Sequence, residues 1–484
     1  MKLYKTLLIV FLAINTISCS DKEDIPTDVQ IQNFVWKGLN AYYLWQKDVP
    51  DLSDRRFNNN QELFGYLDNY SDPENLFYNL LHIPNEYPKD PNRTYSWIVD
   101  DYIALEQSFE GTRQTTGLKL KGADYADGSG NYYVYVYDVV KGSDAETKGI
   151  TRGMLITEVN GTVLTRTNVN ALFSADSFTV QLADYNTGNP VSNGTTITLN
   201  SAIITESPIK KTTIIVDGSH TIGYLMYNQF SRDFDGDLNT EFANFKTAGI
   251  TDLIVDLRYN GGGSVQTAVY LGSMIAGQGN DKLFSKQVWN NKVMAGRNPD
   301  DFINNFTDRI LNKDSNGNTI LDENINNLNL PTVYFIVSEN TASASELVIN
   351  ALSPYINVKL VGSQTYGKHV GSITLYDSDN FSRNGPNFKT NHAWAMQPIV
   401  LEIQNSNGEN KPEGFIPEVI MEEDPSNLGI IGDITEPLLE RTIQYITTGA
   451  KGVSATKKRK SNFTLQWNSN MKYIDYNNMY IDLK

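Results

Sequence analysis

The sequence predicts an α/β fold with two smaller units ahead of the main core. Apolar, β-branched runs alternate with helical patterns over about 208–448, and such alternation is typical of an α/β core. Before this core, apolar residues recur at helical spacing within 31–104, and short strands separated by glycine turns fill 105–207. We therefore expect a helical N-terminal domain, a β-rich domain and an α/β core, with an extension over 449–484.

The N-terminus has the pattern of an export signal. Lys2 and Lys5 precede an apolar run over 7–13, which is too short to span a bilayer as a mature helix. The next residues, Thr16-Ile17-Ser18-Cys19, resemble a bacterial lipobox with Thr16 where Leu is usual. These features predict a lipoprotein signal peptide over 1–19.

Cys19 is the only cysteine of the chain. A single cysteine excludes disulfides within the chain and cysteine metal sites, so lipidation is its expected role. Residues 20–30 then form a polar tether, and the protein is expected on the bacterial outer membrane, facing the periplasm or the cell surface. The acidic stretch over 20–24 resembles a surface-export signal of Bacteroides-group lipoproteins, and an ordinary solvated linker fits it equally well.

Composition limits the partners. The formal net charge is −16, which argues against nucleic acid and anionic membrane surfaces as partners. With 40% hydrophobic residues, the chain can bury extensive cores. Two acidic loops, around 233–237 and 314–318, lack the glycine and glutamate spacing of a calcium loop. We expect neither a metal nor another cofactor.

Ser343 lies at an expected strand-to-helix turn. The run over 333–337 is typical of a buried strand, and the apolar stretch over 347–352 is long enough for a helix. Between them stand Thr341-Ala342-Ser343-Ala344-Ser345-Glu346. The hydroxyl of Ser343 would therefore lie near unpaired helix N–H groups, which favour an oxyanion.

Lys368 is the candidate base for this serine. A serine hydroxyl is a weak nucleophile until a base takes its proton, and a desolvated lysine can be that base. Residues 358–362 form a further expected strand, so the chain leaves along a helix and returns along a neighbouring strand. Lys368 can then approach Ser343, and the chemistry indicated is acyl transfer.

A glycine turn offers backbone donors to the same site. The expected strand over 253–258 is followed by Tyr259-Asn260-Gly261-Gly262-Gly263-Ser264. Glycines after a strand permit close backbone approach to a ligand. Stabilising a tetrahedral intermediate requires such fixed N–H donors.

These three motifs together resemble the C-terminal processing peptidases, also called tail-specific proteases. The residues that carry the resemblance are Ser343-Ala344-Ser345-Glu346, Thr365-Tyr366-Gly367-Lys368, and Asp256-Leu257-Arg258 ending in Gly262-Gly263. The resemblance covers roughly residues 105–448. It implies a ClpP/crotonase-like spiral of βα units and serine endopeptidase activity on proteins or peptides.

The resemblance also implies roles for single residues. Ser343 would be the nucleophile and Lys368 the general base, and the N–H groups of Ala344 and Gly262 would form the oxyanion hole. The family usually has a Gln four residues after the lysine to orient it. That position is Ser372 here, so its hydroxyl is the candidate orienting group.

Residues 105–207 resemble a PDZ domain. The segments 142–145 and 149–153 match the usual helix and turn of the family's PDZ domain. Its carboxylate-binding loop would be Gly117, Leu118, Lys119 and Leu120. Such a domain binds a chain end as an added strand and would present C-terminal tails to Ser343. It could equally gate or brace the site without binding substrate.

Three alternatives remain open at the level of sequence. His369 lies beside Lys368 and could be the base in its place. A PDZ-bearing, non-catalytic peptide-binding lipoprotein on a degenerate protease core is the alternative from another functional class. An esterase would keep the serine but hydrolyse a different bond.

Overall fold

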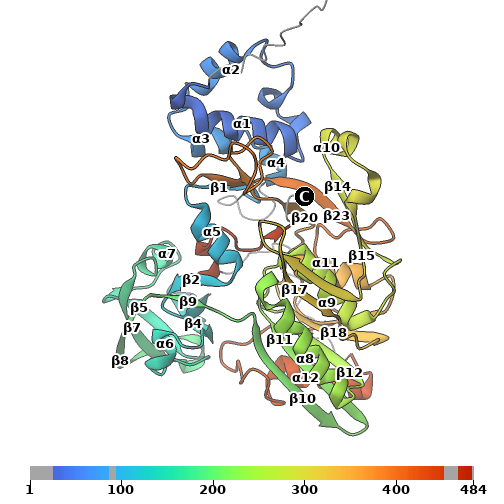
Figure 1. Ribbon diagram of the computed structural model, residues 1–484. Helices are drawn as coiled ribbons and strands as arrows, with labels where there is room; N and C mark the ends of the chain where they lie inside the picture. Colours follow the sequence, from blue (N-terminus) through green and yellow to red (C-terminus); the bar gives the residue numbers. More distant parts are fainter. Residues whose placement is uncertain (1–24, 87–93, 452–466, 482–484) are drawn as a thin grey trace, which may run out of the picture.

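Figure 1 shows the computed structural model, which describes residues 25–86, 94–451 and 467–481. Cys19, the signal peptide expected over 1–19 and residues 20–24 of the expected tether lie outside the described residues. Among the helices of the described ranges, none has the length and apolar character needed to cross a membrane. In Figure 1 the helical unit is at the top, the β-rich unit at the lower left and the α/β core at the lower right.

The helical unit packs onto the α/β core. Its elements are α1 (Gln30–Tyr42), α2 (Asn60–Leu67), α3 (Pro73–Asn79), α4 (Ile83–Glu86), β1 (Trp97–Val99) and α5 (Tyr102–Phe109). Asn59 and Asp72 cap α2 and α3 by accepting hydrogen bonds from the N–H groups of Glu62 and Glu74. Apolar residues of α1 belong to the same buried cluster as the core helices, so this small domain is not separated from the core.

The β-rich unit, residues 112–205, has its own apolar core. Its main sheet has the order β3-β4-β5-β7-β8, β6 pairs with β5, and β2 pairs with β9. The elements are β2 (Thr112–Thr115), β3 (Leu118–Asp124), β4 (Tyr132–Val139), α6 (Asp144–Thr147), β5 (Leu155–Val159), β6 (Thr162–Val163), α7 (Val169–Leu172), β7 (Ser177–Asp184), β8 (Val191–Asn200) and β9 (Ala202–Thr205). The strands expected around 118–120, 133–136 and 155–159 are confirmed.

The α/β core is built on a six-stranded sheet of order β10-β11-β12-β18-β19-β24. All pairs after β10-β11 are parallel. Its strands are β10 (Ile209–Asp217), β11 (His220–Tyr227), β12 (Asp252–Asp256), β18 (Thr332–Val337), β19 (Asn357–Gly362) and β24 (Val419–Ile420). Side chains of α8 (Asp235–Ala248), α9 (Val265–Ala276) and α11 (Ala344–Leu352) pack on one face. Those of α12 (Pro437–Thr448) and of β4 pack on the other. The predicted α/β class is confirmed.

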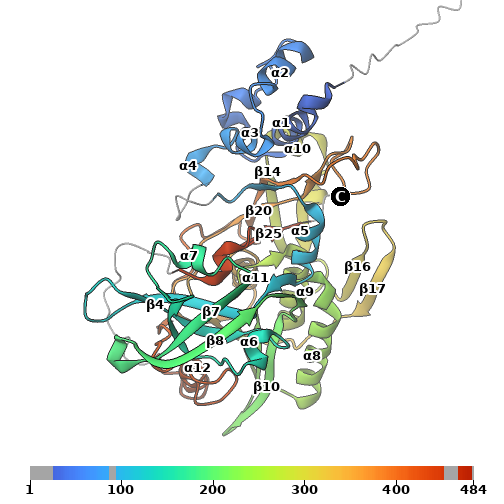
Figure 2. The ribbon, with the colours of Figure 1, turned by 90° about the vertical axis from the view of Figure 1, so that its left-hand side faces the viewer.

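A second sheet lies above the carboxyl ends of these strands (Figure 2). Its order is β13-β25-β20-β23-β14-β15, from β13 (Gly263–Ser264), β25 (Met479–Tyr480), β20 (Val370–Ser372), β23 (Ile399–Gln404), β14 (Leu283–Trp289) and β15 (Ile303–Asn305). Smaller elements complete the fold: α10 (Asn291–Gly296), β16 (Arg309–Lys313), β17 (Thr319–Asn324), β21 (Leu375–Tyr376) and β22 (Ala395–Gln397). Because β25 pairs in parallel with both β13 and β20, the end of the chain is an interior strand of this sheet.

Buried charges join the β-rich unit to the core. Arg258, fully buried just after β12, pairs with Asp256 at 2.7 Å and with Glu436 at 2.6 Å. Glu423 contacts Arg258 at 3.3 Å and also Arg152 of the β-rich unit at 2.8 Å. Burial alone would raise the pKa of Glu423, but the neighbouring cations hold it well below its ordinary range. This network fixes the start of the glycine turn against both units.

We expect Arg258→Met to lower the free energy of unfolding by about 3–5 kcal/mol, because it leaves buried carboxylates without their cation. The measurement is urea unfolding followed by circular dichroism. Arg309→Met is the matched control, since Arg309 and Asp322 form an exposed pair on the β16–β17 hairpin. Equal stability of the two variants would contradict a structural role for the buried network.

Candidate active site

Three turns meet at the candidate active site. Ser343 precedes α11, residues 260–263 follow β12, and residues 365–368 follow β19. The glycine turn lies against the serine: a Cβ placed on Gly262 would be 2.7 Å from Cβ of Ser343 and 3.0 Å from N of Ala344. Gly262 also has φ +115°, so only glycine fits this position.

Ser343 has the backbone strain common at functional positions. Its φ is +64° and its ψ is −117°, outside the ordinary regions for a residue with a side chain. The residue is 0% exposed, and its Oγ has no hydrogen-bond partner. A buried hydroxyl without a partner costs free energy. The fold therefore holds this oxygen in a position that packing alone does not favour.

Glu346 connects the serine to the lysine. Its Oε2 accepts hydrogen bonds from N of Ser343 at 3.0 Å and from N of Lys368 at 2.8 Å. Its Oε1 accepts from N of Gly367 at 2.7 Å and from Oγ1 of Thr365 at 2.5 Å. Because four donors converge on one buried carboxylate, the two turns keep a fixed relative position.

Lys368 is buried next to the serine. It is 3% exposed, and its Nζ donates to the carbonyl oxygen of Asn477 at 2.9 Å. The Nζ also lies 4.9 Å from the ring centroid of Tyr95, on the segment that leads into β1. This Nζ is thus contacted by residues from the N-terminal part and from the C-terminal part of the chain.

Ser343 and Lys368 line one small pocket, here called the serine pocket. It has about 280 Å³ of empty space, part of which is open to solvent. Its other lining residues are Glu346, Leu347, Asn350, His369, Ile403, Asn410, Lys411, Phe415 and Met479. Leu347, Ile403, Phe415 and Met479 supply an apolar wall, so an apolar side chain would fit beside Ser343.

The two expected oxyanion donors are adjacent but differ in availability. The Ala344 N–H opens α11, where the first N–H groups of a helix have no partner within the helix. The Gly262 N–H donates to Oδ1 of Asn260 at 2.8 Å. Asn260 in turn donates from Nδ2 to the carbonyl of Tyr227 at 2.8 Å. Receiving a substrate oxygen at Gly262 therefore requires this turn to rearrange.

The structure does not support Ser372 as the group that orients the lysine. Its hydroxyl lies 3.0 Å from Oδ1 of Asn478 and 3.1 Å from the carbonyl of Met479, and it accepts from Gln397 at 3.1 Å. It contacts the C-terminal segment, residues 467–481, instead.

The C-terminal segment also occupies the edge of β3. Gly122 donates to the carbonyl of Trp467 at 2.9 Å, and Leu120 donates to Oγ of Ser469 at 2.9 Å. Lys121 and Asn468 form an antiparallel bridge. An extended peptide adding to β3 would make the same kind of contacts. The edge expected to receive a peptide ligand is therefore paired with the chain itself.

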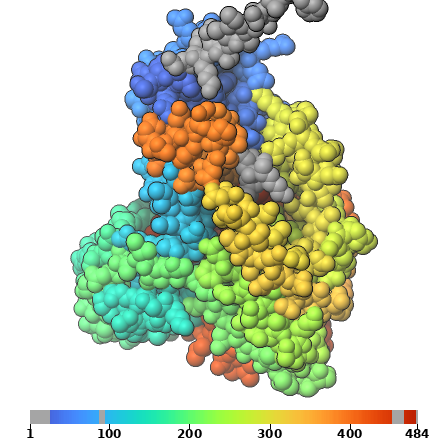
Figure 3. Space-filling model, viewed as in Figure 1, coloured from blue at the N-terminus to red at the C-terminus, as the bar shows by residue number. Residues whose placement is uncertain are grey.

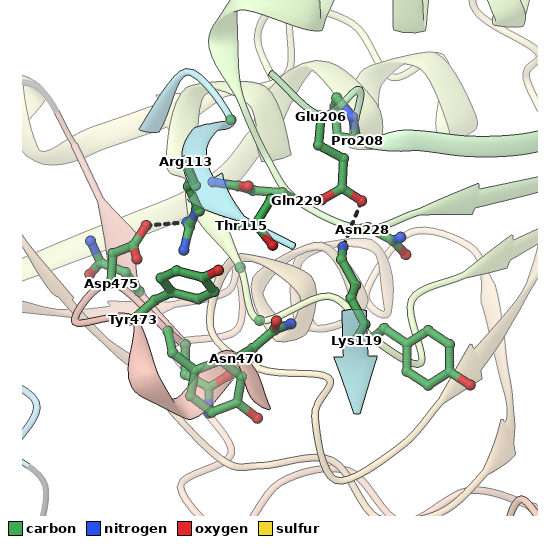
Figure 4. A pocket seen from close by; sticks show the side chains of 18 of the residues that line it. Arg113, Thr115, Lys119, Glu206, Pro208, Asn228, Gln229, Asn470, Tyr473 and Asp475 are labelled. Atoms are coloured by element: carbon green, nitrogen blue, oxygen red, sulfur yellow. Dashed lines mark hydrogen bonds and ion pairs between the residues drawn. The ribbon is translucent and has the colours of Figure 1, made fainter. Parts of the chain in front are cut away.

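A larger pocket lies between the β-rich unit, the glycine turn and the C-terminal segment (Figure 4). It has about 1000 Å³ of empty space, including open solvent. Leu118 and Lys119 of the expected carboxylate loop line it, as do Gly261, Gly262 and Gly263. Lys119 pairs with Glu206 at 2.6 Å, and Arg113 pairs with Asp475 at 2.5 Å.

Other candidates from the sequence lie elsewhere or have other partners. His220 pairs with Asp252 at 2.7 Å, and His392 pairs with Asp377 at 3.0 Å. His369 lines the serine pocket, and its buried Nδ1 has no partner.

In the acidic loops, Asp235 is buried and accepts from Asn312, whereas Asp314 accepts from the N–H groups of its own turn. No group of three metal-binding side chains occurs among the described residues.

Sequence reasoning missed two contributors to the site. Glu346 stands three residues after Ser343, the spacing of a capping box, and this signal could have identified it. Asn477 acts through its backbone carbonyl, which has no signature in sequence.

A strained serine on a strand-to-helix turn, next to a second turn of backbone N–H groups, defines an α/β serine hydrolase site. Comparison with known proteins agrees. Residues 221–382 match the model described as peptidase family S41, and residues 30–97 match the peptidase S41 N-terminal domain. Over these two stretches the chain is similar to peptidase family S41.

Relatives of this chain include two curated proteins. It is 25% identical over 259 residues to the carboxyl-terminal-processing peptidase 1 of Arabidopsis thaliana chloroplasts, covering 52% of this chain and 47% of that protein. It is 27% identical over 158 residues to the "Probable CtpA-like serine protease" of Staphylococcus epidermidis, covering 33% and 27%. The chain thus spans about half or less of the length of these relatives.

A crystal structure of a candidate S41 protease from Bacteroides fragilis has the same fold. The TM-score is 0.64 at 23% identity, and the match covers 86% of this chain and 97% of that one. This likeness shows that the α/β core and the small N-terminal unit occur together in one fold.

We expect Glu346→Gln to lower the rate of any Ser343-dependent reaction by about 100-fold. Glutamine keeps one accepting oxygen and has an NH2 group in place of the other, so the four donors are no longer all satisfied and both turns shift. Rates with a chromogenic ester or peptide measure this. Glu440→Gln, an exposed glutamate of α12, is the control. Unchanged rates in the Glu346 variant would show that its hydrogen bonds do not organise the site.

Glu346 also predicts a pH dependence of stability. Burial raises the pKa of Glu346 to about 7, against the opposing effect of its four hydrogen bonds, whereas an unfolded glutamate titrates near 4.5. The folded protein holds this proton more tightly, so the contribution of Glu346 to the free energy of unfolding falls as the pH rises from about 4.5 to about 7. The stability deficit of Glu346→Gln should therefore shrink between about pH 5 and pH 8. Urea titrations that give a constant deficit would contradict this pKa.

Proposed function

We propose that the protein is a serine endopeptidase that hydrolyses protein or peptide substrates through an acyl-enzyme on Ser343, with Lys368 as the general base. The observation that carries the proposal is the bridge at Oε2 of Glu346, which binds the N–H groups of both residues. Both residues also line the serine pocket. The family assignment supports peptide bond hydrolysis over other acyl transfers.

The proposed reaction uses the lysine twice. The neutral Nζ of Lys368 takes the proton of Ser343 Oγ as this oxygen attacks the peptide carbonyl carbon. The carbonyl oxygen becomes an oxyanion beside the N–H groups of Ala344 and Gly262. Lys368 then returns the proton to the leaving amine, and the C–N bond breaks. Water then loses a proton to the same Nζ as it attacks the ester carbon. Nζ returns this proton to Oγ as the C–O bond breaks, which releases the carboxylic acid and restores Ser343 and the neutral lysine.

Substrate access requires movement. Ser343 is fully buried, and the Gly262 N–H is bonded to Asn260. We infer that substrate binding opens the glycine turn and turns the Gly262 N–H toward the scissile carbonyl. The apolar wall of the serine pocket favours an apolar residue on the amino side of the cleaved bond.

Recognition of C-terminal tails by a PDZ-like β-rich unit is part of the proposal. Gly117, Leu118, Lys119 and Leu120 precede or begin β3, and the larger pocket connects this loop with the glycine turn. Since residues 467–469 pair with the edge of β3, a substrate tail would enter through that pocket or displace these residues.

A second candidate function is peptide binding without catalysis. Two observations favour it: the Gly262 N–H already donates to Asn260, and Ser343 is fully buried. Such a protein would bind peptides with unchanged affinity after substitution of Ser343.

Location on the cell envelope is also proposed. The charged start, the short apolar run and the lipobox-like residues 16–19 support lipidation of Cys19 and anchoring to the bacterial outer membrane. The side of that membrane on which the protease acts is either the periplasm or the cell surface.

Cleavage of an unfolded protein by the chain starting at residue 20 tests the proposed reaction. We expect Ser343→Ala to abolish cleavage and Lys368→Ala to lower it by about 10²–10⁴-fold, the range for loss of a general base. His369→Ala is the matched control and should stay within about tenfold of the parent. Mass spectrometry of the products also identifies the residue preceding each cut. Loss of activity only in the His369 variant would reassign the base, and intact cleavage by Ser343→Ala would exclude this nucleophile.

Labelling of cells with a palmitate analogue tests the anchor. The full chain should incorporate the label and sediment with the outer membrane, because two or more acyl chains hold a protein on a bilayer stably. Cys19→Ala should lose the label. An unlabelled parent protein would exclude the lipoprotein assignment.

A further inference from the structure

The candidate base is bound by a residue far along the chain. The Nζ of Lys368 donates to the carbonyl oxygen of Asn477 at 2.9 Å, and these residues are 109 positions apart. Both are buried, Lys368 at 3% and Asn477 at 6% exposure. A proton can pass between Oγ and Nζ only if Nζ keeps one orientation, and a lysine side chain has four rotatable bonds.

We propose that the C-terminal segment is a built-in part of the active site, in which the backbone carbonyl of Asn477 positions Lys368 for proton transfer with Ser343. This inference rests on the proposed peptidase function. Asn477 is a positioning residue, since its carbonyl acts on the lysine and not on the substrate.

Contacts on both sides fix this carbonyl. The carbonyl of the next residue, Asn478, accepts from N of Gly263 at 2.7 Å, and β25 then pairs with β13 and β20. Before it, Tyr476 donates from its hydroxyl to Asn340 at 2.7 Å. Asn477 itself has φ +61°, which Asn tolerates better than most residues.

Ser372 supports the same assignment. Its hydroxyl donates to Oδ1 of Asn478 at 3.0 Å and to the carbonyl oxygen of Met479 at 3.1 Å. The serine therefore holds the segment whose Asn477 carbonyl binds the lysine.

The segment is part of the fold and not a removable cover. Met479 is 1% exposed and belongs to the main apolar core. Tyr480 stacks on Phe109 of α5 at 4.4 Å between ring centroids. At the other end, residues 467–469 pair with β3, so the same segment ties the β-rich unit to the lysine.

Two substitutions at one position test the inference. Asn477→Gly keeps the positive φ and the carbonyl, whereas Asn477→Val introduces a β-branched side chain that cannot adopt this φ without strain. Both remove an amide whose Oδ1 has no hydrogen-bond partner. We expect Asn477→Gly to stay within about threefold of the parent in kcat. Asn477→Val should lose at least about tenfold in kcat with KM nearly unchanged.

A second readout is independent of cleavage. The rate at which Lys368 is acetylated by an N-hydroxysuccinimide ester, followed by mass spectrometry, should rise in Asn477→Val and stay low in Asn477→Gly.

Equal kcat values and equal acetylation rates in the two variants would overturn the inference. So would higher activity of a chain ending at residue 474, which would make the segment an inhibitor. A parent protein without Ser343-dependent cleavage would refute the proposed function alone, and the acetylation rates would still decide the Lys368–Asn477 contact.

Discussion

The carboxylate of Glu346 is the group on which the site depends. It receives the N–H groups of Ser343, Gly367 and Lys368, so the serine before α11 and the lysine after β19 are fixed by the same two oxygens. Burying a carboxylate is expensive, and four donors offset only part of that cost here, because burial still raises the pKa of Glu346 to about 7. The strained serine can persist because this carboxylate and the glycine turn constrain it from two sides.

Around this centre, the three units are joined by polar groups where they meet. Arg258 and Glu423 connect the glycine turn to Arg152 of the β-rich unit, and Tyr95 of the N-terminal part lies over the lysine. Figure 3 shows the three units in contact on one face of the molecule. The C-terminal segment adds a fourth connection, from β3 to Lys368. We therefore expect a change that moves one unit to reach Ser343 and Lys368.

Local patterns predicted much of this fold. The runs over 333–337 and 358–362 became β18 and β19, and the helix expected over 347–352 lies within α11. Motif spacing also brought Ser343, Gly262 and Lys368 together correctly. The two-residue strand β25 is too short to have a periodicity, and its partners lie more than 100 residues away. The contacts of Ser372 with Asn478 and Met479 were not predictable for the same reason, and its role in orienting the lysine stays a prediction.

The most direct test of the account is covalent labelling of Ser343. A fluorophosphonate reacts only with a serine whose hydroxyl is activated by a base, so it reports the dyad without any assumption about the substrate. The account predicts a single modified peptide containing Ser343 in the parent protein and slow labelling in Lys368→Ala. Labelling of Ser343 at the same rate without Lys368, or no labelling of Ser343 in the parent, would contradict it.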